Sequence, residues 1–338
     1  MKVFYFKEDI RNVTELYYTI MLSALSNVGV ELCELKKSAS LSVLKIPRSQ
    51  YVLATTLKAF IILYVLGYRN IIYWFQGITP EEDYMTYHSI LRKMLFTWAE
   101  KRAVKYSKYR IGVSTYLFEH YEKKYGIAIS KDSVFIMPCF NASSINKQNF
   151  YNLEKYKNNI FCYAGGMQAW QGFDKIVEIY KHVEERFPNV FFKVLSKDIE
   201  AAKRIIERYG IKNYSIYNVP QDKMDEELSS CKFGFIVRED NIINNVATPT
   251  KLGTYVGNGV IPIFTPAIRS FYDMSKKYKY LCCINDNDGS FKEIEALMED
   301  EISPDTLYDE YKEIFDNYYN KEKYIQELSK YLSPLSSL

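Results

Sequence analysis

Residues 233–265 read FGFIVREDNIINNVATPTKLGTYVGNGVIPIFT and decide the fold of this chain. An apolar run, typical of a buried strand, ends at Val237 and is followed by a polar loop. Thr248 and Pro249 form a strong helix start, with Thr as the N-cap residue and Pro at the first helical position, and Gly257 is suited to end that helix. A second apolar run follows at Val260–Phe264. The order strand, helix, strand predicts a βαβ unit with parallel strands.

The same alternation extends along the whole chain and predicts two doubly wound, Rossmann-like α/β domains. A chain of 338 residues is long enough for two domains that each bury a core. We expect them at residues 1–150 and 151–317, with the polar segment Asn141–Asn159 as an inter-domain linker and a last helix, about 318–338, that can pack back on the first domain. The expected strands are Val3–Phe6, Glu31–Leu35, Ser42–Ile46, Asn70–Phe75, Arg110–Val113, Val134–Met137, Ile160–Ala164, Val190–Leu195, Tyr214–Tyr217, Phe233–Val237, Val260–Phe264 and Tyr280–Ile284.

The tail that begins at Ser303 has the spacing of a helix. Its apolar and aromatic residues recur at intervals of three and four, which predicts one buried face. They are Leu307, Tyr311, Ile314 and Tyr318.

The composition, 48% hydrophobic and 25% charged, is that of a globular protein. The six cysteines form no CxxC pair and have no His at ligand spacing, so neither a zinc site nor a disulfide framework is predicted. The start of the chain does not match an export signal, because Glu8 and Asp9 follow a short apolar run, and we expect a cytoplasmic protein. The longest apolar stretch, Tyr51–Tyr68, is short for a membrane span and is interpreted as a core helix.

Lys251 is the first candidate for chemistry. It lies in the first turn of the helix that Pro249 is expected to open, where unpaired backbone N–H groups and the helix dipole already favour an anion. A cation at that place is unfavourable unless an anion offsets it. Arg238 and Asn244 from the preceding loop strengthen the interpretation as a phosphate site. The alternative is that the Lys251 side chain simply extends into solvent.

Residues 161–174, FCYAGGMQAWQGFD, form a second candidate. A strand runs into Gly165 and Gly166, and an amphipathic helix follows. Glycines at the end of a strand let a ligand approach the backbone, a pattern typical of nucleotide sites, although the segment does not match GxGxxG and can be an ordinary turn.

These two stretches carry a resemblance to a known family. YAGGMQAWQGFDKIVEIY and, some 60 residues later, FGFIVREDNIINNVATPTKLGTYVGNGVIPI resemble the donor-binding domain of retaining GT-B glycosyltransferases of family 4, glycosyl transferases group 1, of the bacterial capsule and lipopolysaccharide type. RIGVSTYLFEHYEKKYGI is similar to the last strand and helix of the family's amino-terminal domain. The resemblance implies two domains that face each other across a cleft, with the acceptor on the amino-terminal side and the donor on the other.

The resemblance also implies roles for single residues. The diphosphate of a UDP- or GDP-linked sugar would lie between the glycine pair and the helix at Pro249, with Arg238 and Lys251 as the catalytic cations and without a metal or other cofactor. The remaining expected donor-binding residues are Gln171, Glu239, Asn244, Thr250 and Thr254.

The chain departs from the family pattern at three of its positions. The basic residue of the first glycine loop is replaced by Gln171, and the glutamates of the Glu-x7-Glu pair are replaced by Val246 and Thr254. The carboxylate that usually holds the donor ribose is therefore missing, and Glu239 or Asp240 is its expected substitute. The same departures support an alternative function, a non-catalytic GT-B subunit that assists another transferase.

In the amino-terminal half, the acceptor side is expected to include Arg11, from the loop after the first strand, and Gln76, at the end of the strand over 71–75. Many relatives have a His at the second position. A glutamine can donate and accept hydrogen bonds but cannot act as a general base. By the resemblance, the leaving phosphate itself takes the acceptor proton.

The positive charge of the chain is concentrated in its first part. Residues 1–150 contain 20 Lys and Arg against 12 Asp and Glu, whereas the rest contains 24 against 29. The run Arg92–Arg110 has Glu100 as its only acid, and on a helix Lys101, Lys105 and Lys108 would share one face, with Phe96 and Trp98 able to touch a bilayer. We expect a peripheral contact with the anionic inner face of the plasma membrane, or else a solvated basic surface.

Two other classes of protein fit less well. A two-domain small-molecule binding protein normally has an export signal, and nucleic-acid binding lacks a recognised readout motif. The expected partners are thus a nucleotide-sugar and a glycan or lipid-linked acceptor, and no nucleic acid.

Overall fold

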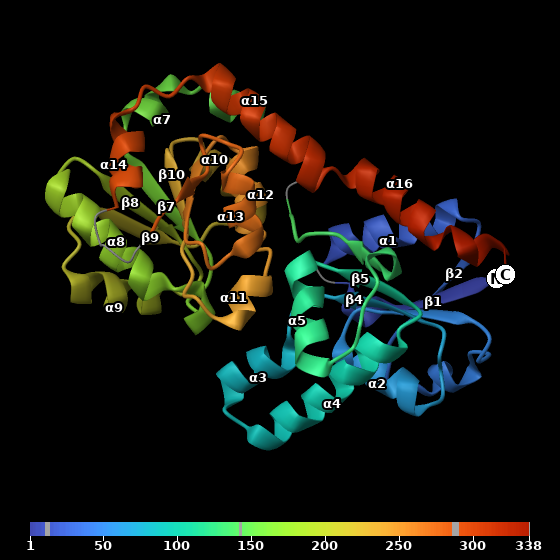
Figure 1. Cartoon of the computed structure of the whole chain (residues 1–338). Helices are drawn as coiled ribbons and strands as arrows, with labels where there is room; N and C mark the ends of the chain where they lie inside the picture. The colour runs from blue at the N-terminus through green and yellow to red at the C-terminus, as the bar shows by residue number, and fades with distance from the viewer. Residues whose placement is uncertain (11–13, 142–143, 286–290, 338) are drawn as a thin grey trace. The chain divides into compact units, whose positions relative to one another are not determined.

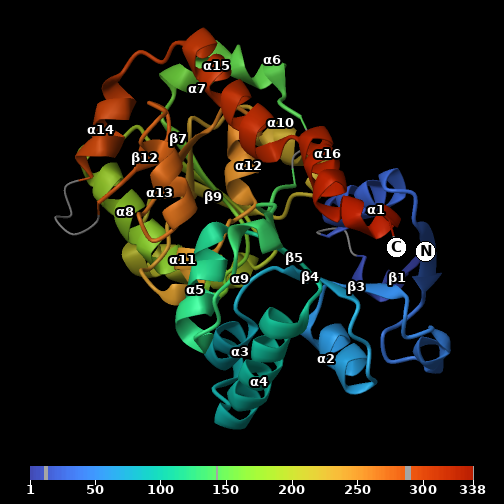
Figure 2. The same ribbon diagram turned by 45° about the vertical axis from the view of Figure 1, so that its right-hand side comes forward.

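The computed structural model describes residues 1–10, 14–141, 144–285 and 291–337. The chain divides into two compact units, Met1–Pro138 with Asn320–Leu338, and Cys139–Tyr319. Each unit contains a sheet with helices on its faces (Figure 1, Figure 2). The described strands of both sheets pair in parallel, so the predicted α/β class with doubly wound sheets is confirmed.

The sheet of the first unit has the order β2-β1-β3-β4-β5-β6 among the described residues. The chain runs from β1 to β2 on one side and then crosses to β3 on the other, so the topological switch point lies between β1 and β3. The central strand β4 has the sequence IIYWF and is buried throughout, as parallel strands covered on both faces are. The strands are β1 (Lys2–Phe6), β2 (Glu31–Leu35), β3 (Tyr51–Ala54), β4 (Ile71–Phe75), β5 (Tyr109–Gly112) and β6 (Val134–Ile136). The helices are α1 (Glu15–Asn27), α2 (Leu57–Val65), α3 (Thr79–Tyr87), α4 (Ile90–Tyr106), α5 (Thr115–Tyr125) and α16 (Lys321–Leu332), with short helices η1 (Lys7–Asp9), η2 (Leu41–Lys45), η3 (Lys131–Ser133) and η7 (Ser333–Ser337).

The carboxyl-terminal helix α16 belongs to this first unit. Figure 1 shows it, in red, beside the blue α1, and the two helices are in extensive contact. The Tyr331 hydroxyl donates to the Ser133 carbonyl oxygen (2.9 Å) and accepts from the Arg110 backbone N–H (3.2 Å). The end of the chain therefore covers the sheet built by its beginning.

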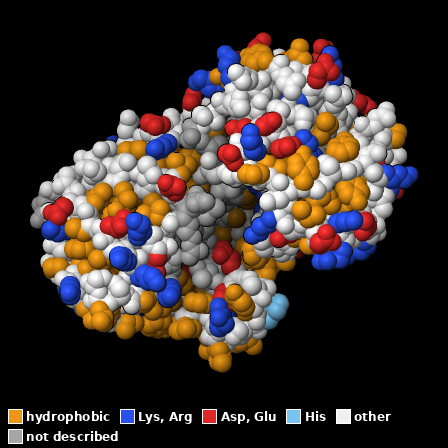
Figure 3. All heavy atoms as spheres, turned by 180° about the vertical axis from the view of Figure 1, so that it is seen from behind, with side chains coloured by type: hydrophobic (Ala, Val, Ile, Leu, Met, Phe, Trp, Pro, Cys, Tyr) orange, Lys and Arg blue, Asp and Glu red, His pale blue; other side chains and the backbone are white. Residues whose placement is uncertain are grey.

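Helices α3 and α4 form a hairpin, and acidic side chains of this hairpin form ion pairs with basic side chains of the same unit. Lys124 on α5 contacts Glu81 and Glu100 (2.8 Å each), and Arg92 pairs with Asp83. Burial raises the pKa of Glu100 to about 7 in spite of Lys124 and of the hydroxyl of Tyr125. The outer surface of the hairpin shows hydrophobic side chains mixed with Lys and Arg, at the lower edge of Figure 3.

Two predictions for the first unit were wrong. Ser42–Ile46 is the short helix η2 and not a strand, because the sheet position is taken by the fully buried β3. The apolar stretch Tyr51–Tyr68 is not one helix: it contains β3 and α2, separated at Thr56, whose side chain accepts from the Ala59 N–H and caps α2. No helix in the described ranges has both the length and the apolar character needed to cross a membrane.

The sheet of the second unit has the order β12-β11-β10-β7-β8-β9 among the described residues, and its switch point lies between β7 and β10. Its strands are β7 (Ile160–Ala164), β8 (Phe191–Leu195), β9 (Tyr214–Tyr217), β10 (Phe233–Ile236), β11 (Ile261–Phe264) and β12 (Cys282–Cys283). Its helices are α6 (Lys147–Phe150), α7 (Leu153–Lys157), α8 (Phe173–Arg186), α9 (Ile199–Tyr209), α10 (Met224–Leu228), α11 (Ile242–Val246), α12 (Lys251–Gly257), α13 (Arg269–Ser275), α14 (Lys292–Glu299) and α15 (Pro304–Ile314), with η4 (Ala169–Gln171), η5 (Gln221–Lys223) and the π-helix η6 (Phe315–Tyr319).

The π-helix η6 changes the register of the predicted tail. Leu307, Tyr311 and Ile314 are buried as their spacing predicts. The wider turn that follows buries Tyr319 and leaves Tyr318 partly exposed, the reverse of what continued α-helical spacing gives.

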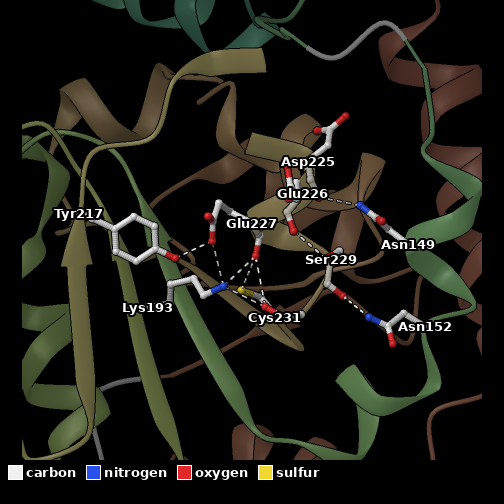
Figure 4. A network of polar contacts seen from close by, with 10 residues as sticks. Asn149, Asn152, Lys193, Tyr217, Asp225, Glu226, Glu227, Ser229 and Cys231 are labelled. Atoms are coloured by element: carbon white, nitrogen blue, oxygen red, sulfur yellow. Dashed lines mark hydrogen bonds and ion pairs between the residues drawn. The ribbon is translucent and has the colours of Figure 1, made fainter. Parts of the chain in front are cut away.

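Residues 144–159 of the expected linker are packed as part of the second unit. They form α6 and α7, and two of their asparagines, Asn149 and Asn152, are hydrogen-bonded to neighbouring elements, as Figure 4 shows. Asn149 Nδ2 donates to the Asp225 carbonyl oxygen (2.9 Å). These two asparagines therefore join the segment to the rest of the second unit.

Replacing Glu100 by Gln tests the pH dependence of the first unit. The folded-state pKa of about 7 is higher than the ordinary 4.5. The buried carboxyl therefore contributes a loss of stability as the pH rises from about 4.5 through about 7. Thermal unfolding of Glu100→Gln and of the unchanged protein at pH 5.5 and pH 8 measures this term. We expect the mutant to gain stability relative to the parent at the higher pH, and parallel pH profiles would contradict it.

Candidate functional site

The candidate site lies at the carboxyl ends of β7 and β10, on the switch point of the second sheet. Ligands of doubly wound sheets bind at such a point, because the loops after the two strands turn to opposite faces and leave room between them. Gly234 pairs with Cys162, so the two strands end side by side. Gly165 follows β7, and Arg238 follows β10 by two residues.

The glycine turn after β7 is shaped by close contacts. A Cβ atom on Gly165 would lie 2.6 Å from Lys251 Cε and 2.8 Å from Lys251 Nζ, so a larger residue here would displace the end of the Lys251 side chain. The Tyr163 hydroxyl donates to the Gly166 carbonyl oxygen (2.6 Å). The Met167 N–H donates to Asp198 Oδ2 (3.0 Å), which fixes the next residue of the turn.

Arg238 and Lys251 meet at the side chain of Gln171. Arg238 Nη2 donates to Gln171 Oε1 (2.7 Å), and Lys251 Nζ donates to the same oxygen. Arg238 is 6% exposed, and its Nη1 is buried without a hydrogen-bond partner among the described residues. Two cations thus share one neutral acceptor.

The pKa values of both groups record this shortage of negative charge. Burial, reinforced by the neighbouring Arg238 guanidinium, holds the pKa of Lys251 well below its usual range. Burial also lowers the pKa of Arg238 to about 10. An anion placed between the two would supply the missing acceptor and raise both pKa values.

Arg238 is held from the neighbouring strand. Thr265 follows β11, and its hydroxyl accepts from the Arg238 N–H (3.1 Å) and donates to the Arg238 carbonyl oxygen (2.6 Å). These two hydrogen bonds hold the Arg238 backbone and so fix the direction in which its guanidinium extends from the sheet.

The helix start was predicted two residues too early. Helix α12 begins at Lys251 with Thr250 as its N-cap residue, and Pro249 precedes the cap. The Thr248 hydroxyl instead accepts from the Cys139 N–H (2.9 Å) and so fixes the loop. The prediction that Lys251 lies in the first turn is confirmed, but a helix of seven residues has a small dipole, and the side-chain cations dominate the electrostatics of the site.

Three other predicted donor-binding residues interact away from this cluster. Asn244 donates from Nδ2 to the Glu239 carbonyl oxygen (3.0 Å) and braces the loop, while the Glu239 side chain is exposed. The Thr254 hydroxyl donates to Asn141 Oδ1 (2.8 Å). Of the predicted residues, the structure therefore brings together Gly165, Gln171, Arg238 and Lys251, with Gly166 in the same turn.

The two predicted acceptor-side residues belong to the first unit. Arg11 lies outside the described residues. Gln76 is exposed just after β4, and its Nε2 donates to the Thr55 carbonyl oxygen (2.8 Å) at the end of β3. Gln76 thus lies at the carboxyl edge of its sheet.

Residues missed by sequence reasoning support the cluster. The Tyr163 ring lies 4.8 Å from Lys251 Nζ in a cation–π contact. The Tyr255 hydroxyl accepts from the Ala164 N–H (3.0 Å) at the end of β7. Gly172 has φ +66°, and a Cβ there would lie 2.9 Å from the Val237 carbonyl oxygen. The position of Tyr163, two residues before the glycine pair, was the available signal.

Metal ligands do not gather in the described part of the chain. No group of three or more His, Cys, Asp or Glu side chains among the described residues could hold a metal ion.

Two doubly wound units of this kind define the GT-B fold, and solved structures confirm it. The chain is similar to HepE from Anabaena, solved in complex with UDP-glucose, at 12% identity and a TM-score of 0.69 over 100% of both chains. It is similar to sucrose-phosphate synthase from Thermosynechococcus elongatus at 11% identity and a TM-score of 0.68, again over 100% of both chains.

A further similarity is to TarM from S. aureus, at 11% identity and a TM-score of 0.59 over 84% of this chain. The chain spans 55% of the length of TarM. No protein-family model matches the sequence, and no curated protein does. At this level of identity, the similarities establish the fold.

Replacing Lys251 by Met tests whether the cation cluster is a cost to stability. Methionine keeps the length of the side chain, removes one of two mutually repelling buried charges and leaves Arg238 bonded to Gln171. We expect the free energy of unfolding at pH 7 to rise by about 1 kcal/mol. Chemical denaturation measures it, and a clear loss of stability would show that Lys251 has a structural role.

Proposed function

We propose that this protein is a glycosyltransferase that moves a sugar from a nucleotide-diphosphate donor to a glycan or lipid-linked acceptor. The observation that carries the proposal is the pair Arg238 and Lys251, which share one neutral oxygen beside a glycine turn at the switch point of a GT-B unit. A diphosphate is the anion that fits, because its several oxygens can accept from both cations at once.

The cations also suit the chemistry of the leaving group. When the bond between the anomeric carbon and the β-phosphate oxygen breaks, negative charge develops on the diphosphate, and fixed cations in a dry site stabilise it. The acceptor oxygen bonds to the same carbon with retention, and its proton passes to a phosphate oxygen. In this scheme Arg238 and Lys251 supply the stabilising charge without a metal.

The remaining donor contacts would come from the surrounding loops. Gly165 and Gly166 allow the phosphates to approach the backbone, and Gln171 orients both cations. Asn244 and Glu239, together with the turn Pro249–Thr250 and Thr254, would complete the pocket for the nucleoside. The UDP-glucose complex of HepE favours a uridine donor over a guanosine donor.

The finer assignment follows the resemblance to retaining family 4 enzymes. The domain of residues 151–317 would bind the donor, and the domain of residues 1–150 would bind the acceptor near Arg11 and Gln76. A cytoplasmic role in the synthesis of bacterial capsule or lipopolysaccharide fits these features.

A second function is favoured by one observation. The positions of the family's two glutamates are neutral here: Val246 is buried, and Thr254 is bonded to Asn141. A chain that lacks this ribose contact could instead serve as a non-catalytic partner of another transferase.

Calorimetric titration with UDP, GDP, UDP-glucose and uridine tests the proposal. We expect micromolar binding of one nucleotide diphosphate and weak binding of its nucleoside. Lys251→Ala should weaken the diphosphate at least tenfold, about 1.4 kcal/mol, and leave the nucleoside unchanged, because the ammonium meets only the phosphates.

The result separates the two functions. Binding of a nucleotide-sugar together with its slow hydrolysis or transfer supports an enzyme. No response to any nucleotide would remove the donor site and leave the partner-subunit function.

Gly165→Ala gives an independent test of the same geometry. Its Cβ would displace Lys251, whereas Gly253→Ala on α12 meets only ordinary contacts at 3.7 Å. We expect the first variant to lose about tenfold in affinity for the nucleotide diphosphate and the second to lose none. Equal affinities of the two variants would show that Lys251 does not need its place beside Gly165.

A further inference from the structure

Helix α4 has an exposed apolar face on its first half. The residues occupy positions i, i+1, i+4, i+5 and i+8, so they form one stripe along the helix. Leu91 is 81% exposed and is among the most exposed large hydrophobic side chains described. The stripe consists of Ile90, Leu91, Met94, Leu95 and Trp98, and the exposed Tyr87 at the end of α3 extends it.

The opposite face of α4 packs into the first unit. Ala99, Ala103 and Val104 are buried, and the helix is in contact with α2. Glu100 points inward and contacts Lys124 on α5. The exposed stripe is therefore an additional apolar surface, which the folding of this unit does not require.

The charges beside the stripe are positive and unpaired. Lys101, Arg102 and Lys105 form no ion pair among the described residues, and Arg102 lies over the Trp98 ring, 4.8 Å from its centroid. Lys101 and Lys105 are exposed.

The acids of the hairpin do not offset these charges. Glu81 and Glu100 contact Lys124, Asp83 pairs with Arg92, and Glu82 accepts from the Ile78 N–H (3.1 Å). The outer surface thus combines long aliphatic side chains, a tryptophan and free cations.

We propose that this face of α4, residues 87–105, docks on the surface of a bilayer that contains anionic lipids. The helix lies in the interface with Leu91, Met94 and Leu95 among the upper acyl chains, Trp98 at the boundary and the cations at the lipid headgroups. The contact is peripheral. It adds a membrane-binding surface to the proposed function.

The structure corrects the surface expected from the sequence. Lys108 lies beyond the end of α4 at Tyr106 and does not share its face, and Phe96 is only partly exposed. Trp98 is exposed as expected, and the other exposed apolar residues are Ile90, Leu91, Met94 and Leu95.

A second copy of the chain fits the surface poorly. In a symmetric dimer two identical faces would pack together, each with the cations Lys101, Arg102 and Lys105, and the hairpin acids Glu81, Glu82, Asp83 and Glu100 are engaged elsewhere. An anionic lipid surface gains from the same charges. Charge complementarity therefore selects the bilayer.

Flotation with phosphatidylcholine vesicles, with and without phosphatidylglycerol, tests the proposal on the full chain without nucleotide. We expect flotation with the mixed vesicles, a decrease with salt, and loss of binding in the double variant Leu91→Glu with Leu95→Glu. Leu41→Glu, at a residue 80% exposed on η2 of the same unit, is the matched control and should bind as the parent does.

The cations are tested separately. Lys101→Gln with Lys105→Gln should lower the partition coefficient about 30-fold, from about 1 kcal/mol for each cation. The fluorescence of Trp98 should shift to the blue on binding, and Trp98→Phe should remove the shift.

Three results would overturn the proposal. These are the absence of flotation with mixed vesicles, flotation that the Leu91 and Leu95 changes leave intact, and a dimer in gel filtration that the same changes dissociate. Because no nucleotide takes part, failure here leaves the proposed sugar transfer untouched, and failure of nucleotide binding leaves the docking surface untouched.

Discussion

The candidate site of the second unit depends on two buried cations that share a single neutral oxygen. Repulsion between Arg238 and Lys251 is unfavourable in a medium of low dielectric constant, and the surrounding structure keeps them together nevertheless. The glycine at 165 makes the space, and Thr265 fixes the backbone of Arg238.

Other buried lysines of the same unit show what a structural cation looks like. Lys155 donates from Nζ to the carbonyl oxygens of Asn149 and Asn258 (3.1 and 2.7 Å), and Lys232 donates to that of Met298 (3.2 Å). Their donors meet backbone carbonyl oxygens, and no second Lys or Arg side chain is seen to share these oxygens among the described residues. Lys251, in contrast, shares one amide oxygen with a second cation, Arg238.

The charged side chains of the first unit are arranged differently from those of the second. Its carboxylates are used to join α3, α4 and α5, so the outer surface of α4 is left with cations beside an apolar stripe. Glu100 shows the cost of that arrangement, because burial raises its pKa to about 7. Because the acids of the hairpin are used on its inner face, its outer face is positively charged.

The sequence by itself determined that the sheets are parallel and that strands alternate with helices, because strands buried on both faces read as apolar runs. It also determined the glycine turn at Gly165 and the place of Lys251 after Pro249. It misplaced the third strand, since both Ser42–Ile46 and Tyr51–Ala54 contain apolar residues, and it is the pairing of Tyr51–Ala54 with β1 and β4 that identifies the strand. Tertiary structure alone decided that Arg238 and Lys251, thirteen positions apart, meet at Gln171, and that Tyr163 supports them. It also decided which face of α4 stays exposed. Apolar residues lie on both faces of this helix, and only its packing against α2 and α5 determines which face is buried. Local patterns record burial, whereas the convergence of charges depends on contacts between distant segments.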